Sequence, residues 1–159
     1  MPDRVAHERL MREALRLAEE NIQDGGGPFG AVVAKDGDLL ARGANRVAPA
    51  ADPTAHAEIV AIRRACQALD DFSLDGCALY ASCEPCPMCL GAVYWARLDA
   101  LYYAATQDDA ARAGFDDAFI YDELATPPTE RQLRTEHMMA EKGKRPFETW
   151  RAHEGRVEY

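Results

Sequence analysis

The first part of the chain places its apolar residues at the spacing of a helix. Between residues 5 and 23 they recur every three or four positions and fall on one side: Leu10, Met11, Ala14, Leu15, Leu17, Ala18 and Ile22. Gly25 follows, and a glycine just beyond the last periodic position often ends a helix. The pattern therefore predicts an amphipathic helix over residues 5–23.

The next stretch has the pattern of a β-hairpin. Residues 31–34 are apolar, residues 35–38 read Lys-Asp-Gly-Asp, and the apolar pattern resumes over residues 39–43. Short strands on either side of such a turn composition are typical of two antiparallel strands.

Helix and strand patterns alternate through the middle of the chain. Asp52, Pro53 and Thr54 supply the capping and first-turn chemistry for a helix that runs to about Leu69. After it we expect a strand, a helix and a strand over residues 77–82, 87–97 and 98–104. This alternation indicates an α/β fold, a three-layer sandwich in which helices flank a central mixed sheet.

Beyond residue 106 the periodic signal weakens. Short helices are expected over residues 108–113, 115–124 and 146–153, with a break at Pro127 and Pro128 and an extended tail from Gly155 to Tyr159. No repeat and no long linker divides the chain, so we expect a single domain over residues 1–159 that ends in a tail.

Composition and charge narrow the class of protein. With 48% hydrophobic and 28% charged residues the chain has ordinary globular composition, which excludes a disordered or low-complexity protein. No apolar run approaches the ~18 residues of a membrane span, and the first ten residues lack a secretory signal, so a cytoplasmic protein without a membrane partner is expected. The net charge of −9 repels phosphate. A small uncharged partner is therefore favoured over nucleic acid.

Three of the five cysteines lie within seven residues, which in a cytosolic chain indicates metal binding before disulfides. In the sequence P-C-P-M-C, Cys86 and Cys89 stand three residues apart where a helix begins at Pro87, so both thiols can share one face of its first turn. The positive end of the helix dipole favours thiolate, the form that binds a metal.

A second motif, H-A-E, lies in the first turn of the helix expected after Pro53. His56 and Glu58 lie just after Pro53, so two helix N-termini can bring His56, Cys86 and Cys89 to one point. Three protein ligands around Zn²⁺ leave an open position for water, the arrangement of catalytic sites. Zinc lowers the pKa of its water towards ~7, and a carboxylate can move the proton. Glu58 would not lie directly beside His56 on an ideal helix, so its role follows from chemistry and not from spacing.

The combination of H-x-E with P-C-x-x-C is the signature of zinc deaminases. Residues 53–59 (PTAHAEI) and 82–89 (SCEPCPMC) resemble the purine-acting branch of the cytidine and deoxycytidylate deaminase superfamily. Four further segments, residues 26–33, 90–97, 113–117 and 158–159, are similar to the bacterial guanine deaminase family. The resemblance covers most of the chain from residue 26 to residue 117, and its end.

The resemblance implies a cytidine deaminase-like fold, one zinc ion per subunit held by His56, Cys86 and Cys89, and Glu58 as the proton shuttle. The implied reaction is hydrolysis of guanine to xanthine and ammonia, with a small purine base as the partner. The other residues that the resemblance implies are Phe29, Asn45, Ala57 and Trp95 around the substrate, Asp117 as a second acid in proton transfer, and the terminal Tyr159.

In that family the C-terminal segment, here about residues 143–159, is exchanged within a homodimer, and Tyr159 would reach the partner's active site. Residues 151–154 depart from the family pattern, which leaves the path of the tail open.

Other interpretations of the same residues stay open. Cys83 could add a fourth ligand and close a structural zinc site, or C-x2-C-x2-C could begin an iron-sulfur site, although its fourth cysteine is missing. Asn45 could be a turn residue, Asp117 a helix cap, and Phe29 and Trp95 core residues.

Other functions are compatible with the same motifs. A tRNA adenosine deaminase shares both motifs, but binding phosphates needs clustered Lys and Arg, and the chain is acidic. Cytosine, cytidine or an aminotriazine such as ammeline would satisfy the same catalytic unit. A non-catalytic zinc module is the alternative from another class.

Overall fold

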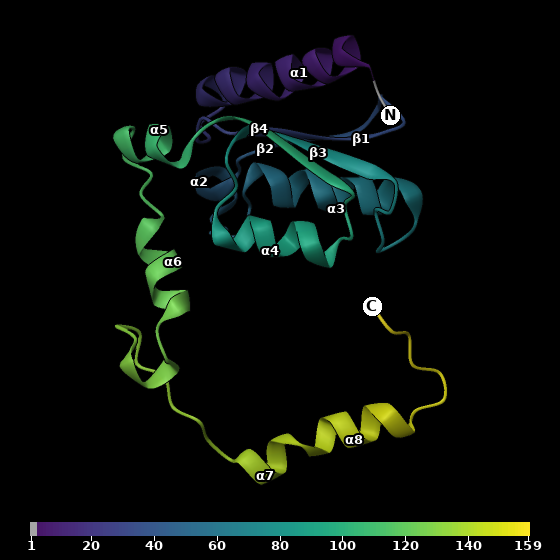
Figure 1. Cartoon of the computed structure of the whole chain (residues 1–159), viewed down its shortest axis with the longest axis vertical. Helices are drawn as coiled ribbons and strands as arrows, with labels where there is room; N and C mark the ends of the chain where they lie inside the picture. Colours follow the sequence, from purple (N-terminus) through teal and green to yellow (C-terminus); the bar gives the residue numbers. More distant parts are fainter. Residues whose placement is uncertain (1–2) are drawn as a thin grey trace. The chain divides into compact units, whose positions relative to one another are not determined.

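The computed structural model describes residues 3–159 and divides into two compact units, Met1–Asp117 and Ala118–Tyr159. The first unit is built on a four-stranded sheet (Figure 1). Its strands are β1 (Gly30–Lys35), β2 (Asp38–Ala44), β3 (Cys77–Cys83) and β4 (Ala100–Ala105), in the order β2-β1-β3-β4. β1 runs antiparallel to β2 and β3, whereas β3 and β4 are parallel. The mixed sheet expected from the sequence is confirmed.

Helices cover both faces of this sheet, which gives the three layers of the sandwich (Figure 1). Helix α1 (Arg4–Gln23) lies on one face, where Leu10 packs with Val32 and Tyr80. Helices α3 (Ala57–Leu69) and α4 (Pro87–Trp95) lie on the other. Because β1 is buried on both faces, its sequence is continuously apolar.

The hairpin between β1 and β2 turns at two residues with positive φ. Asp36 has φ 51° and Gly37 has φ 87°, the combination that a tight two-residue hairpin turn requires. The turn chemistry expected in residues 35–38 is thereby confirmed.

The start of α3 differs from the prediction. Asp52 accepts hydrogen bonds from the backbone N–H (2.8 Å) and the hydroxyl (2.7 Å) of Thr54 and so stabilises a turn. A four-residue helix, α2 (Val47–Ala50), precedes this turn and was not predicted. The long helix begins only at Ala57, and His56 is its N-cap. Asp52 forms its side-chain hydrogen bonds locally, which is why its capping chemistry does not start α3.

Small residues let α3 approach the sheet closely. A Cβ on Gly43 of β2 would lie 2.2 Å from the Ala57 carbonyl oxygen and 2.5 Å from the Ala61 nitrogen. Ala57, Ala61 and Ala65 are buried along the same side of α3. The first turn of α3 is therefore held against the end of β2.

The first unit closes with α5 (Gln107–Arg112), whose N-cap Thr106 forms a capping box with Asp109. The second unit contains α6 (Ala118–Ala125), a 3-10 turn (Pro128–Glu130), α7 (Ala140–Gly143) and α8 (Arg145–Ala152). The helix expected over residues 115–124 starts at Ala118, after Gly114 at φ 95° and a non-helical stretch. No helix or strand follows Ala152, as expected for the tail.

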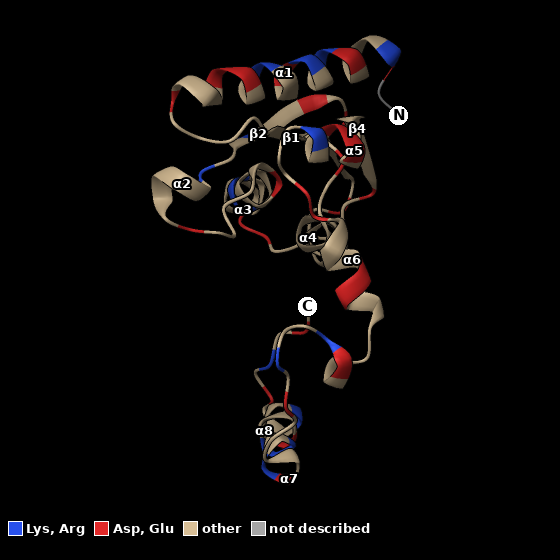
Figure 2. Cartoon of the chain, turned by 90° about the vertical axis from the view of Figure 1, so that its left-hand side faces the viewer, with Lys and Arg blue, Asp and Glu red and all other residues tan. Residues whose placement is uncertain are grey.

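All residues of the second unit are exposed or half-buried, and several large apolar side chains lie on its surface. Among them are Phe119, Leu124, Leu133, Met138, Met139, Phe147, Trp150 and Val157. Charges of both signs follow α1 (Figure 2), where exposed ion pairs join Glu8 to Arg4 and to Arg12. Within residues 3–159, none of the helices combines the length and apolarity that crossing a membrane requires.

Candidate active site

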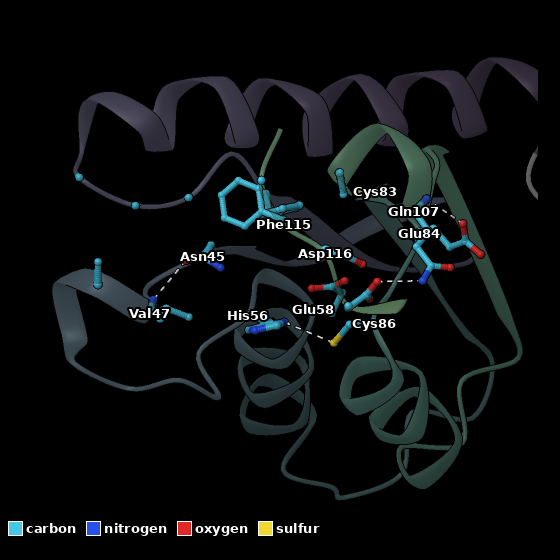
Figure 3. Close-up of a pocket in the computed structure, with 18 residues that line it drawn as sticks. Asn45, Val47, His56, Glu58, Cys83, Glu84, Cys86, Gln107, Phe115 and Asp116 are labelled. Carbon is cyan, nitrogen blue, oxygen red and sulfur yellow. Dashed lines mark hydrogen bonds between the residues drawn. The ribbon is translucent and has the colours of Figure 1, made fainter. Parts of the chain in front are cut away.

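A cavity of about 560 Å³ opens in the first unit at the N-termini of α3 and α4 (Figure 3). Its wall comprises the glycine loop before β1, the segment after β2, the ends of β3 and α5, and the segment before α6. Residues that line it include Gly27, Phe29, Asn45, His56, Glu58, Cys83, Glu84, Cys86, Gln107, Phe115, Asp116 and Asp117.

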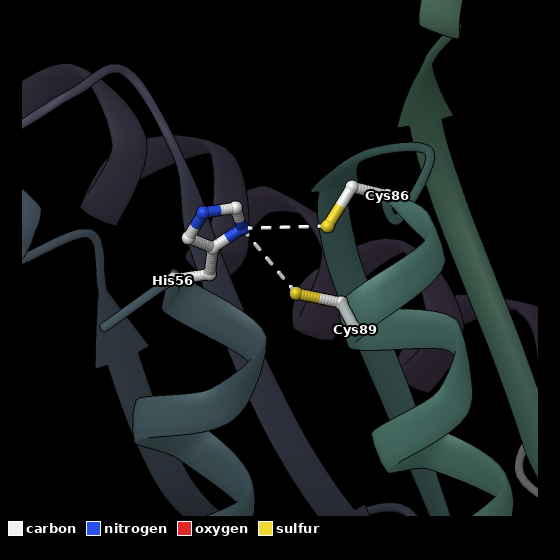
Figure 4. Close-up of side chains that lie close together, drawn as sticks. All are labelled: His56, Cys86 and Cys89. Carbon is white, nitrogen blue, oxygen red and sulfur yellow. Dashed lines mark hydrogen bonds between the residues drawn. The ribbon is translucent and has the colours of Figure 1, made fainter. Parts of the chain in front are cut away.

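His56 and two cysteines converge beside this cavity (Figure 4). His56 Nδ1 lies 3.5 Å from Cys86 Sγ and 3.5 Å from Cys89 Sγ. His56 and Cys86 are the N-caps of α3 and α4, and both have extended backbone, so their side chains are free to turn toward each other. Cys89 follows from the first turn of α4. The convergence expected from the two motifs is therefore present.

These distances fit a shared metal ion. Zinc–sulfur and zinc–nitrogen bonds of ~2.3 Å and ~2.1 Å in a tetrahedral site place the nitrogen and sulfur ligands roughly 3.6 Å apart. Among residues 3–159, His56, Cys86 and Cys89 are the group of three or more potential ligands that gathers within 4.8 Å. A soft thiolate pair with one imidazole is a donor set that suits zinc.

The local electrostatics favour a thiolate at this point. Hydrogen bonds from Cys89 and then from His56 lower the pKa of the Cys86 thiol to about 4. The hydrogen bond to Cys86 raises the pKa of His56 against the opposing effect of burial. The surroundings of Cys86 thus favour its thiolate form.

Cys83 does not join the cluster. Its thiol donates a 3.5 Å hydrogen bond to the Thr106 carbonyl oxygen, and burial raises its pKa to about 11. A neutral thiol with its own acceptor is a poor metal ligand. Within the described chain, the arrangement thus does not support a closed four-ligand site or an iron-sulfur site that uses Cys83.

Glu58 lies in the first turn of α3 and is only 8% exposed. Its carboxylate points into the cavity beside Cys86 (Figure 3). Burial raises the pKa of Glu58, which makes the carboxylate a stronger base. His56 is the N-cap and lies outside the helical turn. Its side chain and that of Glu58 can therefore both line the cavity, although the two residues would not be neighbours on an ideal helix.

Gln107 links two acidic residues of the cavity wall through hydrogen bonds. The Gln107 side-chain amide donates to Asp117 Oδ1 at 2.9 Å, and its backbone N–H donates to Glu84 Oε2 at 2.9 Å. Asp117 is thereby held at the cavity. Neither Gln107 nor Glu84 was predicted from the sequence to belong to the site. Glu84 lies inside the cysteine motif and was open to detection, whereas the contact of Gln107 with Asp117 depends on tertiary structure.

The residues expected around a substrate divide into two groups. Phe29 and Asn45 line the cavity. The Phe29 ring meets Phe115 edge-on, with centroids 4.9 Å apart, and the Asn45 Oδ1 accepts the Val47 N–H at 3.2 Å. Ala57 is buried against β2 and is not a lining residue, while Trp95 is 68% exposed at the end of α4 and lies outside the lining. Tyr159 is exposed at the end of the second unit.

Two helix N-termini, a His-Cys-Cys set and a buried glutamate meet at one cavity, an arrangement typical of metal-dependent hydrolases. The family model described as "Cytidine and deoxycytidylate deaminase zinc-binding region" matches residues 4–105. The chain belongs to this family.

Individual relatives extend the match beyond the family region. The guanine deaminase of Bacillus subtilis (strain 168) is 51% identical over 154 residues, which cover 96% of this chain and 99% of that protein. A crystal structure of guanine deaminase from Bacillus subtilis superimposes with a TM-score of 0.94 at 51% identity, covering 96% of this chain and 98% of that chain.

Two further relatives match a shorter region. A crystal structure of a protein in complex with 2,6-diaminopurine has a TM-score of 0.64 at 43% identity, covering 68% of this chain and 61% of that chain. The tRNA-specific adenosine deaminase of Aquifex aeolicus (strain VF5) is 38% identical over 101 residues, 64% of this chain and 67% of that protein.

Proposed function

We propose that the protein catalyses the hydrolysis of guanine to xanthine and ammonia, with one zinc ion per chain. The observation that carries the proposal is that the likeness to a guanine deaminase extends over 96% of the chain, through the second unit, at 51% identity. The likeness to a tRNA-specific adenosine deaminase covers only 64%.

The metal site supports hydrolytic chemistry. His56, Cys86 and Cys89 would hold the zinc ion, which would supply a Lewis acid that makes water a better nucleophile. Glu58 accepts a proton released by the water and returns it to the departing amine. Water thus adds to the ring carbon that carries the amino group, the carbon–nitrogen bond breaks, and ammonia leaves. Asp117, which lines the same cavity and accepts a hydrogen bond from Gln107, is a second acid that can relay a proton.

Asn45 and Phe29 suit a purine base. Val47 holds the carboxamide oxygen of Asn45, and its nitrogen faces the cavity in Figure 3, where it can donate to a ring acceptor. Phe29, braced by Phe115, offers an aromatic surface against which a planar ring can pack.

The charge of the cavity favours a free base over a nucleotide or an RNA. The lining contains Glu58, Glu84, Asp116 and Asp117 and neither Lys nor Arg. A phosphate group would meet repulsion here, whereas the amino and imino groups of an uncharged base find acceptors.

The protein is proposed to act as a cytoplasmic homodimer whose segment of about residues 143–159 is exchanged between subunits. The exposed apolar side chains of the second unit support an association, because small domains rarely leave so many unburied. Tyr159, exposed at the end of the second unit, is the residue that would reach the partner's active site. Five free thiols suit a reducing compartment.

Ammonia release from a panel of guanine, adenine, cytosine, cytidine, guanosine and ammeline tests the proposal directly. We expect guanine to be deaminated and xanthine to accumulate in equal amount. Faster turnover of another compound would identify that compound as the substrate instead of guanine. Salt-dependent binding of tRNA with conversion of its adenosine to inosine would show that the protein is a tRNA adenosine deaminase.

A further inference from the structure

Asn21 is a buried polar residue that joins two walls of the cavity without lining it. It lies in the last turn of α1 and is 3% exposed. Its side-chain amide nitrogen donates to the Gly27 carbonyl oxygen at 2.8 Å and to the Asn45 carbonyl oxygen at 2.8 Å. Both acceptor residues line the cavity, whereas Asn21 does not.

The neighbours of Asn21 determine which way its amide points. Arg46 Nη1 lies 3.5 Å from Asn21 Oδ1, so the oxygen faces a cationic donor. The nitrogen then faces two carbonyl oxygens, which only a donor can satisfy. An oxygen in place of this nitrogen would confront both carbonyls and repel them.

The glycine loop is packed tightly around this amide. The Gly26 N–H donates to the Asn21 backbone carbonyl at 3.0 Å. A Cβ on Gly26 would lie 2.2 Å from Asn21 Nδ2 and 2.3 Å from the Asn45 carbonyl oxygen. Only a glycine at position 26 can lie this close to Asn21 and Asn45. The loop is thereby fixed against the end of β2.

Asn45 depends on this arrangement for its direction. Its backbone carbonyl is held by Asn21, and its side-chain oxygen accepts the Val47 N–H. These two hydrogen bonds leave the Asn45 amide nitrogen facing the cavity (Figure 3).

We infer that Asn21 is a positioning residue for substrate binding: it holds the Asn45 backbone so that the Asn45 side-chain amide donates to the base. This inference rests on the role proposed above for Asn45. Asn21 contacts neither the base nor the metal ligands, so its effect on binding passes through Asn45.

The test is a double-mutant cycle between Asn21→Asp and Asn45→Ala, with steady-state kinetics, zinc content and thermal unfolding measured for each protein. The base is the one that the wild type deaminates in the panel above, so a failure of guanine as substrate is seen before any variant is made. Gln23→Glu is the matched control, because it makes the same amide-to-carboxylate change at an exposed position two residues away.

We expect Asn21→Asp to raise KM about tenfold, the equivalent of one lost hydrogen bond, while kcat and zinc content change little. In the Asn45→Ala background the same substitution should leave KM within about twofold, because the amide that it positions is gone. Gln23→Glu should match the wild type in every measurement.

Additive effects of the two substitutions on KM would overturn the inference, and so would an Asn45→Ala variant with unchanged KM. A fall in stability without a change in KM would make Asn21 purely structural. Should Asn21→Asp not fold, Asn21→Ser, which keeps a shorter donor, replaces it in the cycle. If that variant also fails to fold, the inference is wrong and Asn21 is a folding residue.

Discussion

Glu58 combines the properties that a proton shuttle needs, namely a buried carboxylate with a raised pKa that opens onto the cavity beside the metal ligands. Glu58→Gln keeps the size of the side chain and removes its proton chemistry. We expect kcat to fall by about 10³-fold or more, while zinc content stays at the wild-type level. Ammonia release and metal analysis measure the two quantities.

Glu8→Gln, on the exposed side of α1, is the control and should leave both unchanged. If Glu58→Gln retains wild-type turnover, another group moves the proton.

Cys83, Cys86 and Cys89 differ in their surroundings despite their regular spacing. Cys86→Ser and Cys89→Ser remove two of the proposed zinc ligands, so each variant should lose most of its zinc after dialysis, and its activity with it. Cys83→Ser should retain the metal, because its thiol donates to the Thr106 carbonyl oxygen instead. Metal analysis of the three purified variants is the measurement, and loss of zinc from Cys83→Ser would indicate a closed four-ligand site.

The gathering of His56, Cys86 and Cys89 was predictable because each motif is compact in sequence. H-x-E and P-C-x-x-C place His56, Cys86 and Cys89 at helix starts, and local backbone geometry does most of the positioning. Gln107 and Asn21 were not predictable, because each acts through a contact with a residue that only the fold brings near.

Among the helices and strands, the contact of α3 with β2 sets the position of the site. Gly43→Ala would drive a methyl group into the backbone of the α3 first turn. We expect the free energy of unfolding to fall by about 3 kcal/mol and turnover to fall with it, because Glu58 lies on the displaced turn. Urea denaturation and ammonia release measure both effects.

Gly91→Ala in α4 is the matched control. Apart from neighbouring backbone of α4, no atom of residues 3–159 lies within 4 Å of the added methyl group, so helix propensity should raise stability by about 0.5–1 kcal/mol. A Gly43→Ala protein as stable as the wild type would contradict the close packing of α3 on β2.

An ion-pair group joins α1 to the edge strand β2. Hydrogen bonds from Arg16 and then from Arg42 lower the pKa of Glu13 to about 2. Because the folded pKa lies below that of the unfolded chain, this stabilisation is complete above about pH 5 and is lost as the pH falls toward 2. Solvent screening limits its size to about 1 kcal/mol.

Glu13→Gln should therefore lower the free energy of unfolding by about 1 kcal/mol at pH 7, and the difference from the wild type should shrink between pH 5 and pH 3. Urea denaturation at several pH values measures this. Glu20→Gln disrupts only an exposed pair within α1 and should have a smaller effect at every pH. A difference that is constant with pH would contradict the role of the charge.

Most helices and strands of the first unit were predictable because their patterns were long and regular, as in the apolar residues 31–34 and the periodic α1. The start of α3 was not, because Asp52 satisfies a local turn with the same chemistry that caps helices. Short segments such as α2 carry too few positions for a periodic signal.

At the scale of the whole molecule, the second unit, residues 118–159, has no buried residues of its own that would account for its stability. Its helices are short and its apolar side chains exposed, which supports the proposed exchange between subunits. Deletion of Glu158 and Tyr159 should then lower turnover at least tenfold while the melting temperature changes by only a few degrees. Light scattering should show a dimer in both proteins. Unchanged kinetics in the truncated protein would exclude a catalytic role for the tail.

The ligands of the metal site come from two helix starts that lie 30 positions apart in the sequence. One coordinated ion would therefore act as a crosslink that closes this loop in the folded chain, as a disulfide does. Folding and zinc availability would then be linked, so the midpoint of unfolding should shift with the concentration of free zinc. Stabilities measured in a chelating buffer and in a zinc-containing one would thus describe two different equilibria.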